Sequence, residues 1–174
     1  MTSKLKVNLI NDAGDNNLIT SDGSGSVTLG TAFPAVGKVG QIIYGSTTSV
    51  VQSTSNSYID TGITATITPV ATSSKICIFV GIMGLQSAGT TNARMDFNIL
   101  RDSTQITSSG ANMWDQSGNN THRNGGFCMN FQDSPSSTSS ITYKVQFKAV
   151  EGTCDVQRDG NSGASTIMLV ELLA

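Results

Sequence analysis

Hydrophobic and polar residues alternate along much of this 174-residue chain. The clearest example is "SITYKVQFKAV", residues 140–150, in which apolar and polar side chains take turns. A period of two residues is typical of a β-strand that buries one face. Such short strands, separated by turn residues, predict a β-sandwich or barrel, and of these we expect an antiparallel sandwich. The other segments with strand character are residues 39–50, 57–60, 62–70, 75–83, 93–108, 126–134, 153–158 and 165–174.

The first 38 residues predict a separate, extended β-arm. "KLKVNLI", residues 4–10, alternates, and two shorter apolar segments follow at residues 18–20 and 26–30. Strands this short bury too little surface to offset the backbone entropy of ordering them. Other copies of the chain, or a host particle, must therefore cover their apolar side chains. We predict that residues 1–38 anchor the protein and hold a trimer together, and that residues 39–174 form the sandwich domain. The expected contacts of the arm are Leu5, Val7, Leu9, Val27, Leu29 and Phe33.

The last segment, residues 166–173, is almost wholly apolar. A strand that is buried on both faces has this composition. We interpret it as a strand at the interface between subunits, with Leu169 and Leu172 as contacts. The alternative is an ordinary central strand of a monomeric sandwich.

The composition agrees with an all-β protein. Charged residues make up 13% of the chain, about half of the usual share, and residues that favour long helices are scarce. A formal net charge of −2 offers no basic surface for a nucleic acid. The longest apolar run, residues 76–85, contains two glycines and is too short to cross a bilayer. We therefore expect neither nucleic-acid binding nor membrane insertion.

Cysteines and carboxylates offer little evidence for a cofactor. An odd number of cysteines without short spacing argues against a disulfide scaffold or a zinc site, so we expect buried free thiols at Cys77, Cys128 and Cys154. The turn-rich first region also contains a loose acidic cluster, which could bind a calcium ion or simply form Asx turns. The sequence predicts no cofactor and leaves an ion site open at Asp12, Asp15 and Asp22.

No arrangement of catalytic residues stands out. The single histidine, His122, lies in polar sequence with no neighbouring nucleophile. The chain lacks a G-x-S-x-G elbow, a P-loop and a dinucleotide fingerprint. Its carboxylates are dispersed, and turns account for several of them, which disfavours a glycoside hydrolase with two facing carboxylates. The sequence therefore predicts a protein that is not an enzyme.

A polar, turn-rich segment at residues 110–125 is the best candidate for recognition of an outside partner. It contains the only tryptophan, Trp114, among asparagine, aspartate and glutamine residues. An exposed aromatic ring flanked by amides suits a sugar or a protein surface, whereas a buried one would close the end of the sandwich. If the segment binds a receptor, the expected contacts are Trp114, Asn120, His122 and Arg123.

Two longer stretches resemble a known group of proteins. They are "SYIDTGITATITPVATSSKICIFVGI", residues 57–82, and "DSPSSTSSITYKVQFKAV", residues 133–150. Both are similar to stretches in small virion-surface proteins of tailed bacteriophages, especially marine and cyanobacterial phages. The resemblance covers roughly residues 41–174, and "LITSDGSGSVTL", residues 18–29, is similar to the β-arm that precedes such domains.

The resemblance implies a jelly-roll or TNF-like sandwich that is commonly trimeric and displayed on a phage particle. It implies a virion location after assembly in the host cytoplasm, with capsid or tail proteins as partners. Because the chain begins with Met1 and lacks shaft repeats, we expect a capsid decoration or head-fibre knob protein. A tail-fibre or receptor-binding module that recognises a host-surface glycan or protein is the alternative.

Overall fold

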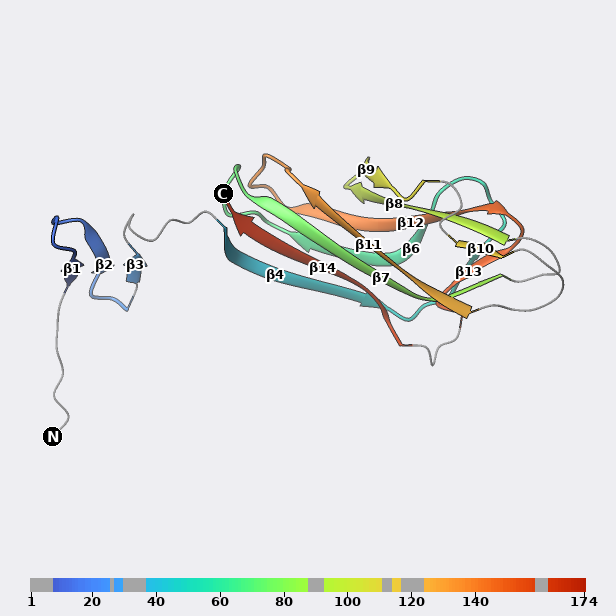
Figure 1. Cartoon of the computed structure of the whole chain (residues 1–174), viewed down its shortest axis with the longest axis horizontal. Coiled ribbons are helices and arrows are strands. Elements are labelled where there is room, and N and C mark those ends of the chain that lie inside the picture. The colour runs from blue at the N-terminus through green and yellow to red at the C-terminus, as the bar shows by residue number, and fades with distance from the viewer. Residues whose placement is uncertain are drawn as a thin grey trace, which may run out of the picture. The chain divides into compact units, whose positions relative to one another are not determined.

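The computed structural model describes residues 8–25, 27–29, 37–87, 93–110, 114–116, 124–158 and 163–174. Every regular element in these ranges is a β-strand. Among the described residues there is no helix with the length and apolar character needed to cross a membrane. The chain divides into two compact units, Met1–Val36 and Gly37–Ala174, and most of their strands are labelled in Figure 1.

The first unit is a small antiparallel sheet of three strands. β1 (Leu9–Asn11), β2 (Asn17–Ser21) and β3 (Val27–Leu29) pair in chain order. No residue whose burial is described in this unit is buried, because strands of three to five residues cannot enclose a core of their own.

The second unit contains two antiparallel sheets. The smaller sheet has the order β10-β8-β12-β6, and β9 also pairs with β8. Both short strands lie along one edge of β8, where β10 pairs with its first residues and β9 with its last. The strands of this sheet are β6 (Ile59–Ile67), β8 (Ala93–Arg101), β9 (Thr104–Ser108), β10 (Trp114–Gln116) and β12 (Ile141–Glu151).

The larger sheet is built around its longest strand, β7. The final strand, β14, pairs with β4 on one side and with β7 on the other, and β11 pairs with the opposite edge of β7. The short strand β13 pairs with the last residues of β7, Gln86 and Ser87, and β5 pairs in turn with β13. The strands are β4 (Lys38–Thr47), β5 (Val51–Ser53), β7 (Lys75–Ser87), β11 (Asn124–Asp133), β13 (Cys154–Val156) and β14 (Ser165–Leu173).

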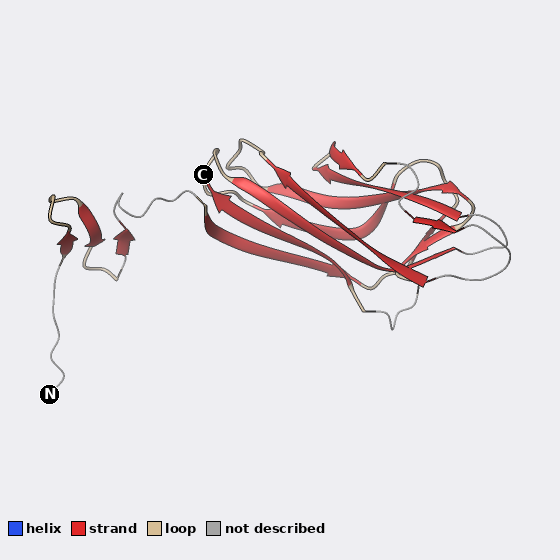
Figure 2. Ribbon diagram, in the orientation of Figure 1, coloured by secondary structure: helices blue, strands red, loops and turns tan. Residues whose placement is uncertain are grey.

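The two sheets face each other and enclose one hydrophobic core, and Figure 2 shows them as two layers of strands. β12 buries every second residue, from Ile141 to Ala149, as its alternation predicts. At the centre, the ring of Phe97 stacks on Phe127 of the other sheet at 5.1 Å and lies 6.3 Å from Phe147. The prediction of an all-β, antiparallel sandwich is confirmed.

The sheets approach most closely where β4 passes β6. A Cβ atom at Gly45 would overlap the carbonyl oxygen of Thr64, so no other residue fits there without moving the backbone. Gly62 lies nearby with a φ of 82°, in a bulge that adds two residues to β6 between its pairs with β12. Such a bulge bends the strand that contains it.

The last strand, β14, buries one of its two faces within its own domain. β14 is not buried on both faces within the domain, because its residues alternate between buried and half-buried positions from Ser165 to Val170. Its inward side chains join the core, and its outward side chains form part of the outer surface of the larger sheet. The sequence suggests burial on both faces because most residues of both sets are apolar, the inward Glu171 being the charged exception.

Candidate functional site

The first unit exposes several apolar side chains on β1 and β3, while Leu18 and Ile19 on β2 are half-buried. Leu9 and Ile10 on β1 are exposed, and Val27 on β3 is 61% exposed. Leu29 lies in β3, but its side chain is not described. The other predicted arm contacts, Leu5, Val7 and Phe33, lie outside the described residues.

The acidic residues of the first unit are used by its turns. Asp12 Oδ1 accepts hydrogen bonds from the backbone N–H groups of Gly14 at 2.8 Å and Asn16 at 3.0 Å, and both of its oxygens accept from the Asn16 amide. These hydrogen bonds lower the pKa of Asp12. Asp22 accepts from the backbone N–H of Ser24 at 2.8 Å. This is Asx-turn chemistry, and the described residues contain no group of three metal-ligating side chains.

The predicted receptor segment is described only in part. Trp114 begins β10, which pairs with β8, but its side chain is not described. Asn120, His122 and Arg123 lie outside the described residues. Recognition through this segment stays a prediction.

The two predicted contacts in the last strand lie on opposite faces. Leu169 is fully buried in the core of its own domain, where a partner subunit cannot reach it. Leu172 is half-buried on the outer side. Residues three apart in a strand point in opposite directions, so the two side chains cannot share one interface. The outward residues of β14 are Thr166, Met168, Val170 and Leu172.

The cysteines are free, but they are not all buried. Cys154 is buried, Cys77 is half-buried and Cys128 is exposed. The expectation of three buried thiols is therefore wrong at Cys128, which shares the outward face of β11 with Asn130 and Gln132. Burial, together with the neighbouring charge of Asp155, raises the pKa of Cys154 to about 12.

The outer face of the smaller sheet is polar and carries paired charges. Asp96 is almost fully buried on this face, and its carboxylate accepts hydrogen bonds of 2.7 Å from Tyr58 and from Ser109. Lys148 lies 3.6 Å from the same carboxylate and 4.9 Å from the centre of the Tyr58 ring. Burial and the Asp96 carboxylate together raise the pKa of Tyr58. Because every group here has a partner, the cluster stabilises the fold and offers no reactive atom.

A second polar cluster joins the two sheets. The Asp133 carboxylate, at the end of β11, accepts hydrogen bonds of 3.0 Å from Arg101 to both of its oxygens and one of 2.7 Å from the Tyr143 hydroxyl. Asp102, in the adjacent turn, accepts from the backbone N–H of Thr142 at 2.9 Å and has a φ of 53°. These carboxylates therefore have structural partners, and they do not face each other across a groove as a glycosidase pair would.

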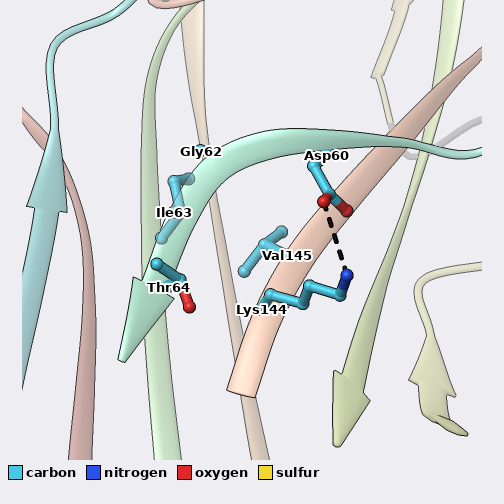
Figure 3. A pocket seen from close by; sticks show the side chains of 6 residues that line it. All are labelled: Asp60, Gly62, Ile63, Thr64, Lys144 and Val145. Atoms are coloured by element: carbon cyan, nitrogen blue, oxygen red, sulfur yellow. Dashed lines mark hydrogen bonds and ion pairs between the residues drawn. The ribbon is translucent and has the colours of Figure 1, made fainter. Parts of the chain in front are cut away.

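A hollow of about 150 Å³ lies beside the β6 bulge (Figure 3). Asp60 and Lys144 form an ion pair at its rim, with 3.4 Å between the amine nitrogen and the carboxylate. The other Asp60 oxygen accepts a 2.7 Å hydrogen bond from Gln146. One carboxylate already paired with one amine does not make an acid–base site, and the remaining lining residues are Gly62, Ile63, Thr64 and Val145.

The outer face of the larger sheet is apolar, in contrast to the polar face opposite. Two rows of neighbouring outward residues cross β4, β14 and β7. Tyr44, Met168 and Phe79 form one row, and Ile42, Val170 and Cys77 form the next. On β11 the rows end in Asn130 and Gln132. No outward residue in these rows is charged.

The sequence pointed to this face only through the interface predicted for residues 166–173, although a signal for the rest of it was present. β7 and β14 are apolar at both odd and even positions, which is also what a strand buried on both faces looks like. The structure separates the two sets, because Ile78 and Leu169 point inward while Phe79 and Met168 point outward. An outward apolar set of this size is typical of an interaction surface.

Comparisons with known proteins give little guidance. No protein-family model matches the chain, and no curated protein matches it. A chain in the structure of infectious bursal disease virus Gt strain is 12% identical with a TM-score of 0.39, and the match covers 97% of this chain and 47% of that one. A chain of the Gx strain is 13% identical with a TM-score of 0.35, covering 91% and 43%. This chain thus spans less than half the length of either, and likeness at this level carries no argument about function.

Proposed function

We propose that the chain is a non-enzymatic structural protein of a tailed-phage virion. In this proposal residues 1–38 anchor the protein to the particle, and the sandwich projects from the particle surface. The protein acts as a homotrimer and is a capsid decoration or head-fibre knob protein. Its chemistry is association, which buries apolar surface between proteins.

The first unit carries this proposal. It exposes Leu9, Ile10 and Val27 on a sheet that contains no buried residue among those described. An apolar surface on so small a sheet gains stability only when another protein covers it. Residues 57–82 and 133–150 resemble phage virion-surface proteins. This resemblance suggests that proteins of a phage particle cover the apolar surface of the first unit.

The chemistry of the second unit supports association over catalysis. Its buried carboxylates Asp96 and Asp133 are held by hydrogen bonds and ion pairs, and the described hollows bring together no nucleophile with a base. The recognisable surface features of this unit are a charged, internally paired face and an apolar face. Both suit a protein whose role is to fold stably and to bind other proteins.

The test uses particles that carry this protein. A variant with Leu9→Ser, Ile10→Ser and Val27→Ser should lose incorporation into particles, while its sandwich unfolds at the same denaturant concentration as the wild type. A matched control, Val50→Ser, replaces an exposed apolar residue of the second unit and should leave incorporation unchanged. Normal incorporation of the triple variant would refute anchoring by the first unit.

The copy number separates the two versions of the proposal. Quantitative mass spectrometry of purified particles should find many copies for capsid decoration and few for a tail-fibre or receptor-binding module. For the second version, replacing residues 110–125 should abolish binding to host cells.

A further inference from the structure

The apolar outer face of the larger sheet is among the larger apolar patches that a protein surface carries. Tyr44 is 63% exposed, Ile42 is 59% exposed and Phe79 is 41% exposed. Large apolar side chains offer about 150–250 Å² each when fully exposed, so this face and its half-buried neighbours expose on the order of 500 Å². This lies near the upper end of the largest apolar patches on monomeric proteins, which are roughly 300–600 Å².

The two flanks of this face differ in shape. Tyr44 protrudes on β4, at one flank. An open hollow of about 280 Å³ lies at the other flank, between β7 and β11. Cavities of about 150 Å³ already hold a benzene ring, so this hollow has room for an aromatic side chain. The hollow is lined by Cys77, Ile78, Phe79, Asn130, Phe131 and Gln132.

The chemistry of the two flanks also matches. A tyrosine that becomes buried needs a hydrogen-bond partner for its hydroxyl. The wall of the hollow supplies apolar atoms from Phe79 and amide groups from Asn130 and Gln132. In the register of the sheet, Asn130 lies in the same row as Tyr44, with Met168 and Phe79 between them.

We propose that this face binds the same face of a second copy of the chain, with Tyr44 of one copy seated in the hollow between β7 and β11 of its neighbour. The occupant is a second copy because the protruding Tyr44 side chain and the hollow lie on the same face of the sheet, at opposite flanks. A neighbour related by a twofold axis that runs between the two faces, parallel to the strands, therefore places its β4 over β11 of the first copy. The face also carries no charge in its two central rows, so two copies meet without repulsion or a buried unpaired charge. The inference rests on the proposed function and deepens it by naming a surface for self-association. Because the same face meets itself, this contact has a twofold axis, and it joins two single copies or one copy from each of two trimers.

The native cysteine in the hollow makes a direct test possible. In a full-length Cys128→Ser background, a short bis-maleimide should cross-link Tyr44→Cys to Cys77 of a neighbouring copy, since sheets packed face to face lie about 10 Å apart, too far for a disulfide. Peptide mapping by mass spectrometry should identify the 44–77 link, and Cys77→Ser should abolish it. Thr66→Cys, an exposed position on the outer face of the smaller sheet, is the matched control and should form no such link. Absence of the 44–77 link, or a dimer that persists in Cys77→Ser, would overturn the proposal.

Because Tyr44→Cys itself removes the protruding tyrosine ring, a second measurement uses variants that introduce no new cysteine. By sedimentation equilibrium, the wild type should self-associate at micromolar concentration, and Tyr44→Ser should weaken this by at least about tenfold. Tyr44→Phe keeps the ring and should stay closer to the wild type than Tyr44→Ser. A wild type that is monomeric at these concentrations overturns the proposal.

Failure of this inference can be distinguished from failure of the proposed function. If the wild type is monomeric but Tyr44→Ser is lost from particles, the face binds another virion protein. The inference and the homotrimer are then overturned, while the role as a virion structural protein stands. If the wild type self-associates through the 44–77 contact but is absent from particles, the inference stands and the proposed function fails.

Discussion

The hydroxyl of Tyr143 donates a 2.7 Å hydrogen bond to Asp133 Oδ2 and thereby links the two sheets of the sandwich. Tyr143 comes from the smaller sheet and is fully buried, while Asp133 ends β11 of the larger sheet. Arg101 binds the same carboxylate. Burial and the Asp133 carboxylate together raise the pKa of Tyr143, so its proton stays in place as the donor.

Removing this hydroxyl should destabilise the domain. Tyr143→Phe keeps the ring but removes the hydrogen bond that the buried Asp133 carboxylate accepts from the hydroxyl. We expect the free energy of unfolding to fall by about 1–3 kcal/mol. Urea unfolding measures the change. Tyr58→Phe removes a hydroxyl from a tyrosine that is more exposed than Tyr143, so it is the control and should cost less. Equal stability of Tyr143→Phe and the wild type would contradict this role.

Glu171 should make the fold sensitive to acid. Burial alone would disfavour its charged form, but hydrogen bonds from the Gln41 amide and from the Val70 backbone N–H, each of 2.7 Å, outweigh this and lower its pKa. The folded state therefore favours the carboxylate over the unfolded state. Its stabilisation is complete above the ordinary pKa of 4.5 and is lost as the pH falls through the lowered folded value.

The variant Glu171→Gln isolates this effect. At pH 7 its free energy of unfolding should be about 1.5–3 kcal/mol lower than that of the wild type. The reason is that the Gln41 amide and the Val70 N–H no longer donate to a charged carboxylate. The difference between the two proteins should narrow below pH 4.5, since the wild type loses its charge there. Denaturant titrations from pH 7 to pH 3 test this, and a constant difference across the range would disprove it.

The contact of β4 with β6 depends on Gly45. Gly45→Ala places a methyl group on the carbonyl oxygen of Thr64, so β4 must move away from β6. We expect a loss of several kcal/mol or failure to fold, seen as a large drop in the melting temperature. Gly81→Ala is the matched control in the same sheet. Its nearest neighbour would be Thr166 Oγ1 at 3.4 Å, an ordinary contact, so its melting temperature should change little.

The three thiols should differ in reactivity. The pKa of Cys154 is raised to about 12 by its burial and by the charge of Asp155, so at pH 8 it stays protonated and inaccessible. A thiol reagent should label Cys128 in the native protein and Cys154 only when urea unfolds the domain. Mass spectrometry of peptides reports each site, and labelling of Cys154 as fast as Cys128 would contradict the described burial.

The alternation of residues predicted much of this fold but not its surfaces. In β12 one parity is apolar and the other polar, so the buried set from Ile141 to Ala149 could be identified directly. In β14 both parities are apolar, so the sequence could not tell Leu169, which is buried, from Met168, which faces outward. Which of two apolar sets points inward depends on the neighbouring sheet, and the pattern along one strand does not contain that information.

Glu171 and the Tyr44 hollow depend on contacts between distant parts of the chain. A glutamate in an apolar strand has no local partner, and its donors come from Gln41 and Val70, about 130 and 100 positions away. The hollow arises where β7 pairs with β11, so its lining combines residues from two separate segments. Neither could be deduced from residue spacing. The predicted contacts Asn120, His122 and Arg123 remain untested, because they lie outside the described residues.

The central place of β14 in the larger sheet has a consequence for biosynthesis. This strand joins β4 to β7, yet the ribosome makes it after every other strand described here. Until it arrives, a nascent chain presents two open strand edges that can pair with another molecule. Premature termination before Ser165 should therefore yield aggregates or substrates for chaperones and proteases, and no shortened but working sandwich.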